Sequence, residues 1–276
     1  MRNWRCFGRV LTVVTFLSVR AWAQPSAQTP AAPVLLSRAV VFNYPETDPY
    51  DPANRYGYNH APSVTRLGNG DLLCAWFSGP YEAAVNQVIL ASRSKDQGFT
   101  WEKAFVLNRT QHKSSFDPAF ISDGERTWLF FTIGRWDRYP LLEEEHDGGV
   151  GTCSYHTYIR QSSDAGQTWS RLSQCPGTFF CRSNGIKLSS GELLLPVYTV
   201  KDNGDEDPVY PAKDNGDQYQ ARTFRSIDGG KTWTLGEPVT SPAGADEPTI
   251  AEVSVGRVLM IPPDARWLHL AILFLR

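Results

Sequence analysis

The feature that most constrains the fold is an eight-residue motif, Ser-x-Asp-x-Gly-x-Thr-Trp, which occurs three times in the 276 residues. Its copies are residues 94–101, 162–169 and 226–233, and they start 68 and 64 residues apart. The Asp carboxylate accepts backbone N–H groups within a tight turn, Gly tolerates the positive φ of such a turn, and Trp buries a large area beside it. We therefore predict that each copy is a turn between two strands.

A second pattern alternates with the motif. It reads as Pro or Gly with apolar neighbours, a short gap, Gly, and then a strongly apolar run, over residues 62–76, 118–131, 185–196 and 248–260. Each copy predicts a hairpin whose strands are buried on both faces. One such hairpin and one motif-bearing hairpin make a four-stranded unit of roughly 60 residues, and units of fixed period indicate the blades of a β-propeller. We therefore predict an all-β fold with about three complete four-stranded blades and part of a fourth.

The N-terminal residues have the pattern of a secretory signal peptide. A basic start precedes an apolar run over residues 10–19 and the small-residue signal Ala21-Trp22-Ala23. This pattern predicts a mature start near Gln24 and a secreted or periplasmic protein, and no later apolar run is long enough to span a membrane. The expected divisions are a signal peptide (1–23), a flexible leader (24–37), the propeller (38–261) and a divergent C-terminal tail (262–276).

The charge and the cysteine content limit the binding partners, disulfides and metal sites that this protein can have. Removal of the signal peptide takes away four Arg and no acid, which moves the formal charge from −2 to −6, unlike the basic footprint of a nucleic-acid binder. The four remaining cysteines permit disulfides in an exported chain. Cys74 lies in an apolar run and is predicted to be a buried free thiol, which leaves the pairing open among Cys153, Cys175 and Cys181. No Cys or His spacing fits a zinc site, so we expect no metal.

The two patterns resemble those of the sialidase-like superfamily of six-bladed β-propellers, where the eight-residue motif is called the Asp box or BNR repeat. The resemblance extends from about residue 55 to residue 261 and includes Gly70-Asp-Leu-Leu, Arg93-Ser94 before the first motif, and Glu247-Pro248. In that family the Asp boxes lie at hairpin turns away from the central mouth, which implies structural roles for the same residues here. These residues are Asp96, Gly98, Trp101, Asp164, Gly166, Trp169, Asp228, Gly230 and Trp233.

The residues just before the innermost strand of each blade converge on the central mouth of a propeller. In this sequence that position gives His60, Asp117, Asn184 and Glu247, all of them polar. Polar groups are costly to bury without partners, so a ring of them predicts a ligand-facing pocket. The alternative is that they cap strands by bonding the neighbouring backbone, for which an acid before a proline is suited.

Three more charged residues are expected at the same mouth. Glu82 and Arg135 lie in the loops after the second strand of the first two inner hairpins, and Arg182 lies two residues before Asn184. A guanidinium pairs with a carboxylate in a planar fork, which would suit an anionic sugar. For either Arg, a structural ion pair with a nearby Asp or Glu explains the residue equally well.

The family resemblance implies a catalytic set made of a Tyr nucleophile, a Glu beside it, an Asp acid/base and three Arg that hold the substrate carboxylate. Glu247 matches the family Glu, and the acid/base loop offers only Glu82. His60 stands where the first Arg is expected, and the chain reads Ile261-Pro-Pro-Asp264 where the second is expected. No Tyr follows Tyr219, so the match to the catalytic set is partial.

The resemblance thus implies an exported glycoside hydrolase of the exo-α-sialidase type, which acts on terminal acidic sugars of glycans and uses no cofactor. Glu247 and Glu82 would be its catalytic residues. The substrate would be held by His60, Asp117, Arg135, Arg182 and Asn184. Because His60 replaces an expected Arg, the same motifs also fit a different substrate, a non-catalytic carbohydrate- or protein-binding propeller, or an inactive fragment.

The pattern changes at Pro262-Pro263, after the start of the fourth inner hairpin. We expect that the chain is truncated, or that its reading frame changes, after about Ile261. The alternative is a shorter open propeller, or one that closes by dimerisation.

Overall fold

The structure is a computed structural model that describes residues 38–43, 55–82, 84–136, 153–200, 219–239, 244–262 and 273–275. These residues all belong to one unit that begins at Ser37. The predicted signal peptide and leader, and residues 263–272 of the predicted tail, lie outside the described residues. The described segments include no helix that is long and apolar enough to cross a membrane.

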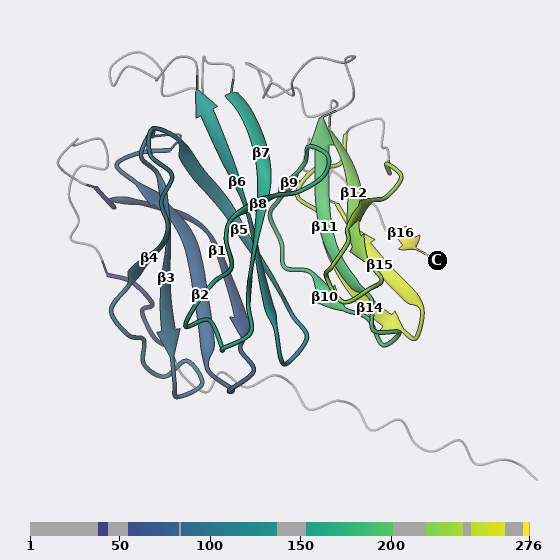
Figure 1. Cartoon of the computed structure of the whole chain (residues 1–276), viewed down its shortest axis with the longest axis horizontal. Coiled ribbons are helices and arrows are strands. Elements are labelled where there is room, and N and C mark those ends of the chain that lie inside the picture. The colour runs from purple at the N-terminus through teal and green to yellow at the C-terminus, as the bar shows by residue number, and fades with distance from the viewer. Residues whose placement is uncertain are drawn as a thin grey trace, which may run out of the picture. The chain divides into compact units, whose positions relative to one another are not determined.

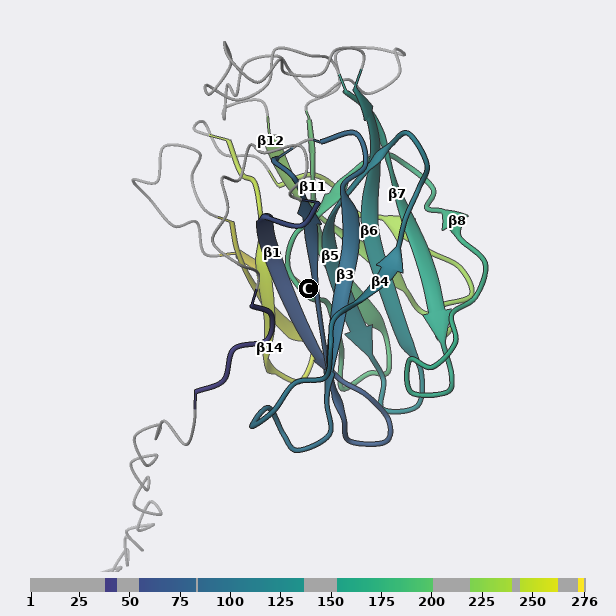
Figure 2. The same cartoon turned by 90° about the vertical axis from the view of Figure 1, so that its left-hand side faces the viewer.

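The described residues form four antiparallel β-sheets that follow one another along the chain (Figure 1). The first sheet contains β1 (Tyr58–Arg66), β2 (Leu72–Gly79), β3 (Val88–Ser94) and β4 (Phe105–Asn108). The second contains β5 (Ser114–Ser122), β6 (Thr127–Trp136), β7 (Cys153–Ser162) and β8 (Ser173–Gln174), which lie side by side in this order in Figure 2. The third contains β9 (Phe180–Cys181), β10 (Ile186–Lys187), β11 (Leu193–Val200), β12 (Tyr219–Ser226) and β13 (Thr234–Leu235). The fourth contains β14 (Thr249–Ser254), β15 (Arg257–Ile261) and β16 (Leu273–Leu275).

The third sheet has an interrupted inner strand. The short strands β9 and β10 both pair with β11, so together they take the place that β1 and β5 hold in the first two sheets. The third sheet is therefore a four-stranded unit with a break over residues 182–185. This confirms the prediction of about three complete four-stranded units and part of a fourth.

The fourth sheet is the partial unit. Its second strand, β15, has five residues, whereas β2 and β11 have eight and β6 has ten. β15 ends at Ile261, where the sequence pattern changes, and β16 from the predicted tail pairs with it.

Burial differs between the first and second strands of the inner hairpins. β2 and β11 are buried along almost their whole length, because each is central in its sheet and covered on both faces. β1 and β14 keep one face open, and Val64 on β1 is 50% exposed. The prediction that both strands of each hairpin are buried on both faces is therefore wrong for β1 and β14, each of which has exposed residues along one face.

Neighbouring sheets pack face to face through apolar side chains. Between the first and second sheets, Phe77 and Ile89 share a buried cluster with Leu129 and Phe131. The second and third sheets share a cluster made of Trp128, Phe130, Cys181, Leu195 and Phe224, among others. The third and fourth sheets share one that includes Leu194, Ala221, Ile250 and Met260. Each burial of this kind removes apolar area from water, which is the main favourable term in folding.

The three eight-residue motifs are turns between strands, as predicted: β3 to β4, β7 to β8, and β12 to β13. In the first turn, Ser94 Oγ accepts the Gly98 N–H at 2.8 Å and donates to Asp96 at 2.8 Å. The Asp96 carboxylate accepts the N–H and the hydroxyl of Thr100 at 2.8 and 2.6 Å. The second and third turns repeat these bonds. Each motif thus satisfies its own carboxylate within eight residues.

These bonds explain the low proton affinity of the motif carboxylates. The Thr hydroxyl and the Thr backbone N–H lower the pKa of Asp96, Asp164 and Asp228, to about 2 for Asp164. A carboxylate that accepts several hydrogen bonds is stabilised in its charged form. The motif acids are therefore ionised structural groups.

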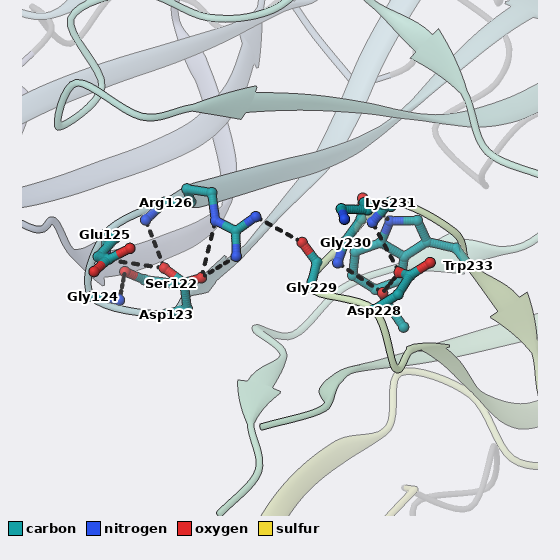
Figure 3. A network of polar contacts seen from close by, with 11 residues as sticks. Ser122, Asp123, Gly124, Glu125, Arg126, Asp228, Gly229, Gly230, Lys231 and Trp233 are labelled. Carbon is teal, nitrogen blue, oxygen red and sulfur yellow. Dashed lines mark hydrogen bonds and ion pairs between the residues drawn. The ribbon is translucent and has the colours of Figure 1, made fainter. Parts of the chain in front are cut away.

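An arginine from each of the first two sheets reaches into the motif turn of the next sheet. Arg126 donates to Asp123 in its own sheet at 3.0 Å and to the Gly229 carbonyl in the third motif at 2.9 Å (Figure 3). Arg93 likewise donates to Asp71 at 3.1 Å and to the Ala165 carbonyl in the second motif at 2.8 Å. Both carbonyls belong to the motif residue between Asp and Gly. The two arginines thus tie neighbouring sheets together at the motif end.

Three cysteine side chains are described, and none of the three is in a disulfide. Cys74, Cys175 and Cys181 are buried free thiols, and burial raises the pKa of Cys74 to about 11 and that of Cys175 to about 12. The prediction for Cys74 is confirmed. Cys175 and Cys181 are not bridged to each other, and the side chain of Cys153 lies outside the described residues.

The Arg93 contacts predict a measurable loss of stability. Arg93→Met would leave the 15%-exposed Asp71 side chain without its cation and would remove the bond to the Ala165 carbonyl. We expect the free energy of unfolding to fall by about 2 kcal/mol in urea titrations. The control is Arg171→Met, at an exposed position, which should change it by less than about 0.5 kcal/mol. Equal effects of the two changes would contradict the role given to Arg93.

Candidate active site

The inner strands begin at the end of each sheet opposite to the motif turns. In the first sheet His60 pairs with Phe77 near the start of β1, whereas Leu72, next to the motif residue Ser94, pairs with the last residue of β1. The same register holds in the second sheet, where β5 begins opposite the end of β6. We call the end at which the inner strands begin the mouth end.

Three residues at this end share a strained backbone conformation. Ala61, Asp117 and Glu247 have φ values of 53°, 53° and 38°, and each is followed by Pro. The pairing of β1 shifts between His60 and Ser63, and that of β5 shifts between Phe116 and Ala119. A β-bulge of this kind re-aims a side chain, and positive φ in a non-glycine residue persists where the surroundings enforce it.

This shared geometry changes which residue of the first sheet is equivalent to Asp117. The register places Ala61, and not His60, at the position that Asp117 occupies in the second sheet. The sequence pattern put His60 there because it precedes Ala61-Pro62. The sequence alone does not show that Ala61, the residue before Pro62, adopts positive φ.

Asp117, Arg182 and Glu247 form an ion-pair cluster at the mouth end. Arg182 Nε donates to Glu247 Oε1 at 3.2 Å, and Arg182 Nη1 lies 3.9 Å from Asp117 Oδ1. The three side chains are 22%, 37% and 15% exposed for Arg182, Glu247 and Asp117. Arg182 lies in the break in the third sheet, Glu247 lies two residues before β14, and Asp117 lies in the bulge of β5. The three residues are spaced 65 positions apart in the sequence. Three sheets therefore contribute one charge each, which only their packing brings together.

Burial raises the pKa of the Asp117 carboxyl. Its pKa rises to about 7, chiefly because the carboxyl is removed from water, and the nearby charges of Glu247 and Glu82 raise it further while Arg182 opposes them. The thiol of Cys181 donates to the Asp117 backbone carbonyl at 3.3 Å, which helps to fix the bulge. At neutral pH Asp117 therefore exchanges between its protonated and ionised forms.

Asn184 has a different role from the one its position suggests. Its Oδ1 accepts the Phe120 backbone N–H at 2.7 Å and the Ser63 hydroxyl, and its Nδ2 donates to the Val64 carbonyl at 2.7 Å. These partners lie on β1 and β5, so Asn184 joins the inner strands of the first two sheets to the break in the third. The side chain is engaged in this bridge and is not part of the ion-pair cluster.

His60 and Glu82 form an outer pair. His60 Nδ1 lies 3.8 Å from Glu82 Oε1, with the side chains 49% and 63% exposed. The His60 ring packs edge-on against Phe77 at 5.4 Å and against Tyr58 at 5.9 Å. Arg135 is exposed near the end of β6 and does not take part in the ion pairs of the cluster.

A cavity of about 640 Å³ lies along the inner strands toward the motif end. Its lining includes Arg66, Ser122, Asn184 and Lys187, but neither Asp117, Arg182 nor Glu247. Asn184 therefore borders this cavity, which is separate from the ion-pair cluster. Within the described part of the chain, no group of three or more His, Cys, Asp or Glu side chains could hold a metal ion.

The chain matches a protein family and several known proteins. The family described as "BNR repeat-like domain" matches residues 70–263. A sialidase from Micromonospora viridifaciens is 28% identical over 227 residues, which are 74% of this chain and 32% of that protein. A sialidase from Paraclostridium sordellii is 23% identical over 220 residues, which are 70% of this chain and 50% of that protein. The chain thus spans a third to a half of the length of these relatives.

Solved structures show the same fold. The Hadza microbial sialidase Hz136 superimposes with a TM-score of 0.60 at 18% identity, over 81% of this chain and 45% of that chain. The NanB sialidase from Streptococcus pneumoniae superimposes with a TM-score of 0.58 at 13% identity, over 86% and 54% of the two chains. At these identities the likeness extends to the fold alone, and it confirms the predicted sialidase-type propeller architecture.

The hydrogen bonds of Asn184 generate a stability prediction. Asn184→Ala would leave the Phe120 N–H and the Val64 carbonyl without the side-chain partner they have now. We expect a loss of about 2–3 kcal/mol in the free energy of unfolding, measured by chemical denaturation. The control is Asn86→Ala at an exposed loop position, with an expected change below about 0.5 kcal/mol. A stability loss for Asn184→Ala no larger than that of the control would contradict the bridging role.

Proposed function

The chain belongs to the BNR repeat-like family, and from this membership and the mouth cluster we propose that it is a sialidase-like glycoside hydrolase that acts on terminal acidic sugars of glycans. The relationship to the two bacterial sialidases supports the substrate class, since both are described by that activity. The proposed partner is accordingly a glycan or glycoconjugate.

The cluster of Asp117, Arg182 and Glu247 is the observation that carries the proposal. Three partly buried charges meet at the mouth end, two of them on residues with positive φ. Strained backbone costs of order 1–3 kcal/mol per residue, and perturbed ionisable groups gather where chemistry or binding requires them. We therefore propose that these three side chains face a bound substrate.

The side chains suggest distinct roles in this site. Glu247 accepts a hydrogen bond from Arg182 Nε at 3.2 Å, and we assign to it the role of the base. Arg182 uses Nε and Nη1 for its two carboxylates, so its Nη2 is the group placed to pair with a substrate carboxylate. His60, Glu82 and Arg135, at the outer part of the mouth end, are proposed to contact the sugar or its aglycone.

We propose further that the protein is exported. The basic start, the apolar run and Ala21-Trp22-Ala23 support this proposal. N-terminal sequencing of the protein recovered from the periplasm or medium would test it, with an expected first residue near Gln24. An intact N-terminus on protein retained in the cytoplasm would contradict it.

Glu247→Gln tests the enzymatic role. The change keeps the shape and removes the charge, so kcat/KM should fall by about 10²–10⁴-fold on the best substrate of a panel of fluorogenic acidic and neutral glycosides. The control is Glu237→Gln, at an exposed position, which should leave kcat/KM unchanged.

Two outcomes would contradict the proposal. Undiminished turnover by Glu247→Gln would remove Glu247 from the chemistry. Glycan binding by the wild-type protein without any turnover would assign the mouth to a carbohydrate-binding module instead.

A further inference from the structure

We propose that a cavity between the second and third sheets binds a neutral hexose residue of a glycan. The cavity has a volume of about 450 Å³, and residues 230–233 of the third motif belong to its lining. It therefore lies at the motif end, and its lining includes neither Asp117, Arg182 nor Glu247. This second site goes beyond the function proposed for the mouth and does not depend on it.

Two strand pairings determine which side chains of the second sheet face this cavity. Trp128 on β6 pairs with Gln161 on β7, and Ser173 on β8 pairs with Ile159, two residues before Gln161. Directly opposed residues of antiparallel strands, and residues two apart on one strand, point to the same face of a sheet. Trp128 and Ile159 pack in the cluster shared with the third sheet. Gln161 and Ser173 therefore lie on the face that looks toward the third sheet.

The cavity has an aromatic floor. Trp128, Phe224 and Trp233 all belong to its lining. Trp128 and Phe224 are fully buried, and the half-buried Trp233 ring stacks on Phe224 with an interplanar angle of 12°. Ligand pockets of this size are lined mostly by apolar and aromatic side chains, and a Trp ring can pack against the C–H face of a pyranose. The floor therefore offers a surface for a sugar ring.

Trp128 is a feature of the second sheet and not of the repeat. It pairs with the residue directly before the second motif. The residues that pair with the position directly before the first and third motifs are Leu73 and Leu194. The second sheet thus presents an indole to the third sheet at a position where the first and third sheets have an aliphatic side chain.

Polar side chains line the same cavity above the aromatic floor. Gln161 is half-buried, whereas Ser173 and Lys231 are exposed. Lys231 belongs to the third motif, between Gly230 and Trp233 (Figure 3). An amide and a hydroxyl can each donate and accept a hydrogen bond, and an ammonium donates. Because each sugar hydroxyl is also both a donor and an acceptor, this set matches the neighbouring hydroxyls of a hexose.

The charges of the lining favour a neutral sugar. No Asp or Glu is among the described residues that line the cavity. The Arg160 guanidinium is engaged elsewhere, because it donates to the Ser170 carbonyl at 2.9 Å and to the Leu107 carbonyl of the first sheet at 3.3 Å. Lys231 is a hydrated point charge, which lacks the planar fork with which a guanidinium selects a carboxylate. The cavity therefore offers hydrogen bonds and an aromatic surface without a carboxylate clamp.

The double variant Gln161→Ala/Ser173→Ala tests the site. The probes are the methyl glycosides of glucose, galactose and mannose, and N-acetylglucosamine, each titrated by saturation-transfer difference NMR. We expect the wild-type protein to bind at least one of them with a Kd of about 1 mM, since a ligand with so few atoms gains limited binding free energy. The double variant should bind that probe about tenfold more weakly, because two side-chain hydrogen bonds are lost.

A matched control is Ser163→Ala/Gln167→Ala. These exposed residues of the second motif have the same side chains and are not in the lining of the cavity. The control should bind the probe as the wild type does. Equal thermal unfolding midpoints of the two double variants would show that both are folded.

Two further variants separate this cavity from the mouth. Ser173→Phe adds a ring at an exposed position of the lining and should abolish binding of the probe by filling the cavity. Glu247→Gln changes the mouth and should leave binding of the probe unchanged. The double variant Gln161→Ala/Ser173→Ala should in turn keep the wild-type kcat/KM on a small fluorogenic glycoside.

Several results would overturn the inference. One is a folded wild-type protein that binds none of the neutral probes. Another is binding that survives both Gln161→Ala/Ser173→Ala and Ser173→Phe, or that is lost in Glu247→Gln, which would place the sugar at the mouth. Binding of sialyllactose without binding of any neutral probe would overturn the neutral class of ligand. A wild-type protein that binds a neutral probe in this cavity and hydrolyses no glycoside supports the second site and removes the proposed function.

Discussion

Face-to-face packing of neighbouring sheets is the interaction on which the rest of this structure depends. Second strands such as β2 and β11 are buried on both faces, and clusters of aromatic and aliphatic side chains lie between successive sheets. This packing fixes the sheets in one order and one direction, so that the inner strands start at a common end. The ion-pair cluster forms because this packing brings residues from three sheets together.

Asp side chains have lowered pKa values at one end of the sheets and a raised pKa at the other. At the motif end, each Asp accepts bonds from a Thr four residues away, which stabilises its charge and lowers its pKa. At the mouth end, Asp117 is buried and faces two other carboxylates, so its pKa rises to about 7. Local hydrogen bonds therefore lower the pKa of the motif acids, whereas burial raises the pKa of Asp117.

Two of the three residues in the ion-pair cluster have a strained backbone. Asp117 and Glu247 both adopt positive φ, a cost that the bulge, the following prolines and the surrounding bonds impose on them. Asn184 supports this region, because its three hydrogen bonds hold the inner strands of the first two sheets against the break in the third. Asn184, two residues after Arg182, thus anchors the break from which Arg182 reaches the two carboxylates.

The sequence by itself determined the turns, the hairpins and their repetition, because the bonds of each motif close within eight residues and strand patterns are equally local. It also identified the charged residues available to the mouth, including Asp117, Arg182 and Glu247. Only the tertiary structure decided which of them meet, since their contacts join residues 65 positions apart and depend on bulges that redirect side chains. For the same reason it placed Ala61 where His60 was expected, turned Asn184 into a structural bridge, and raised the pKa of Asp117 by burial that no local pattern records.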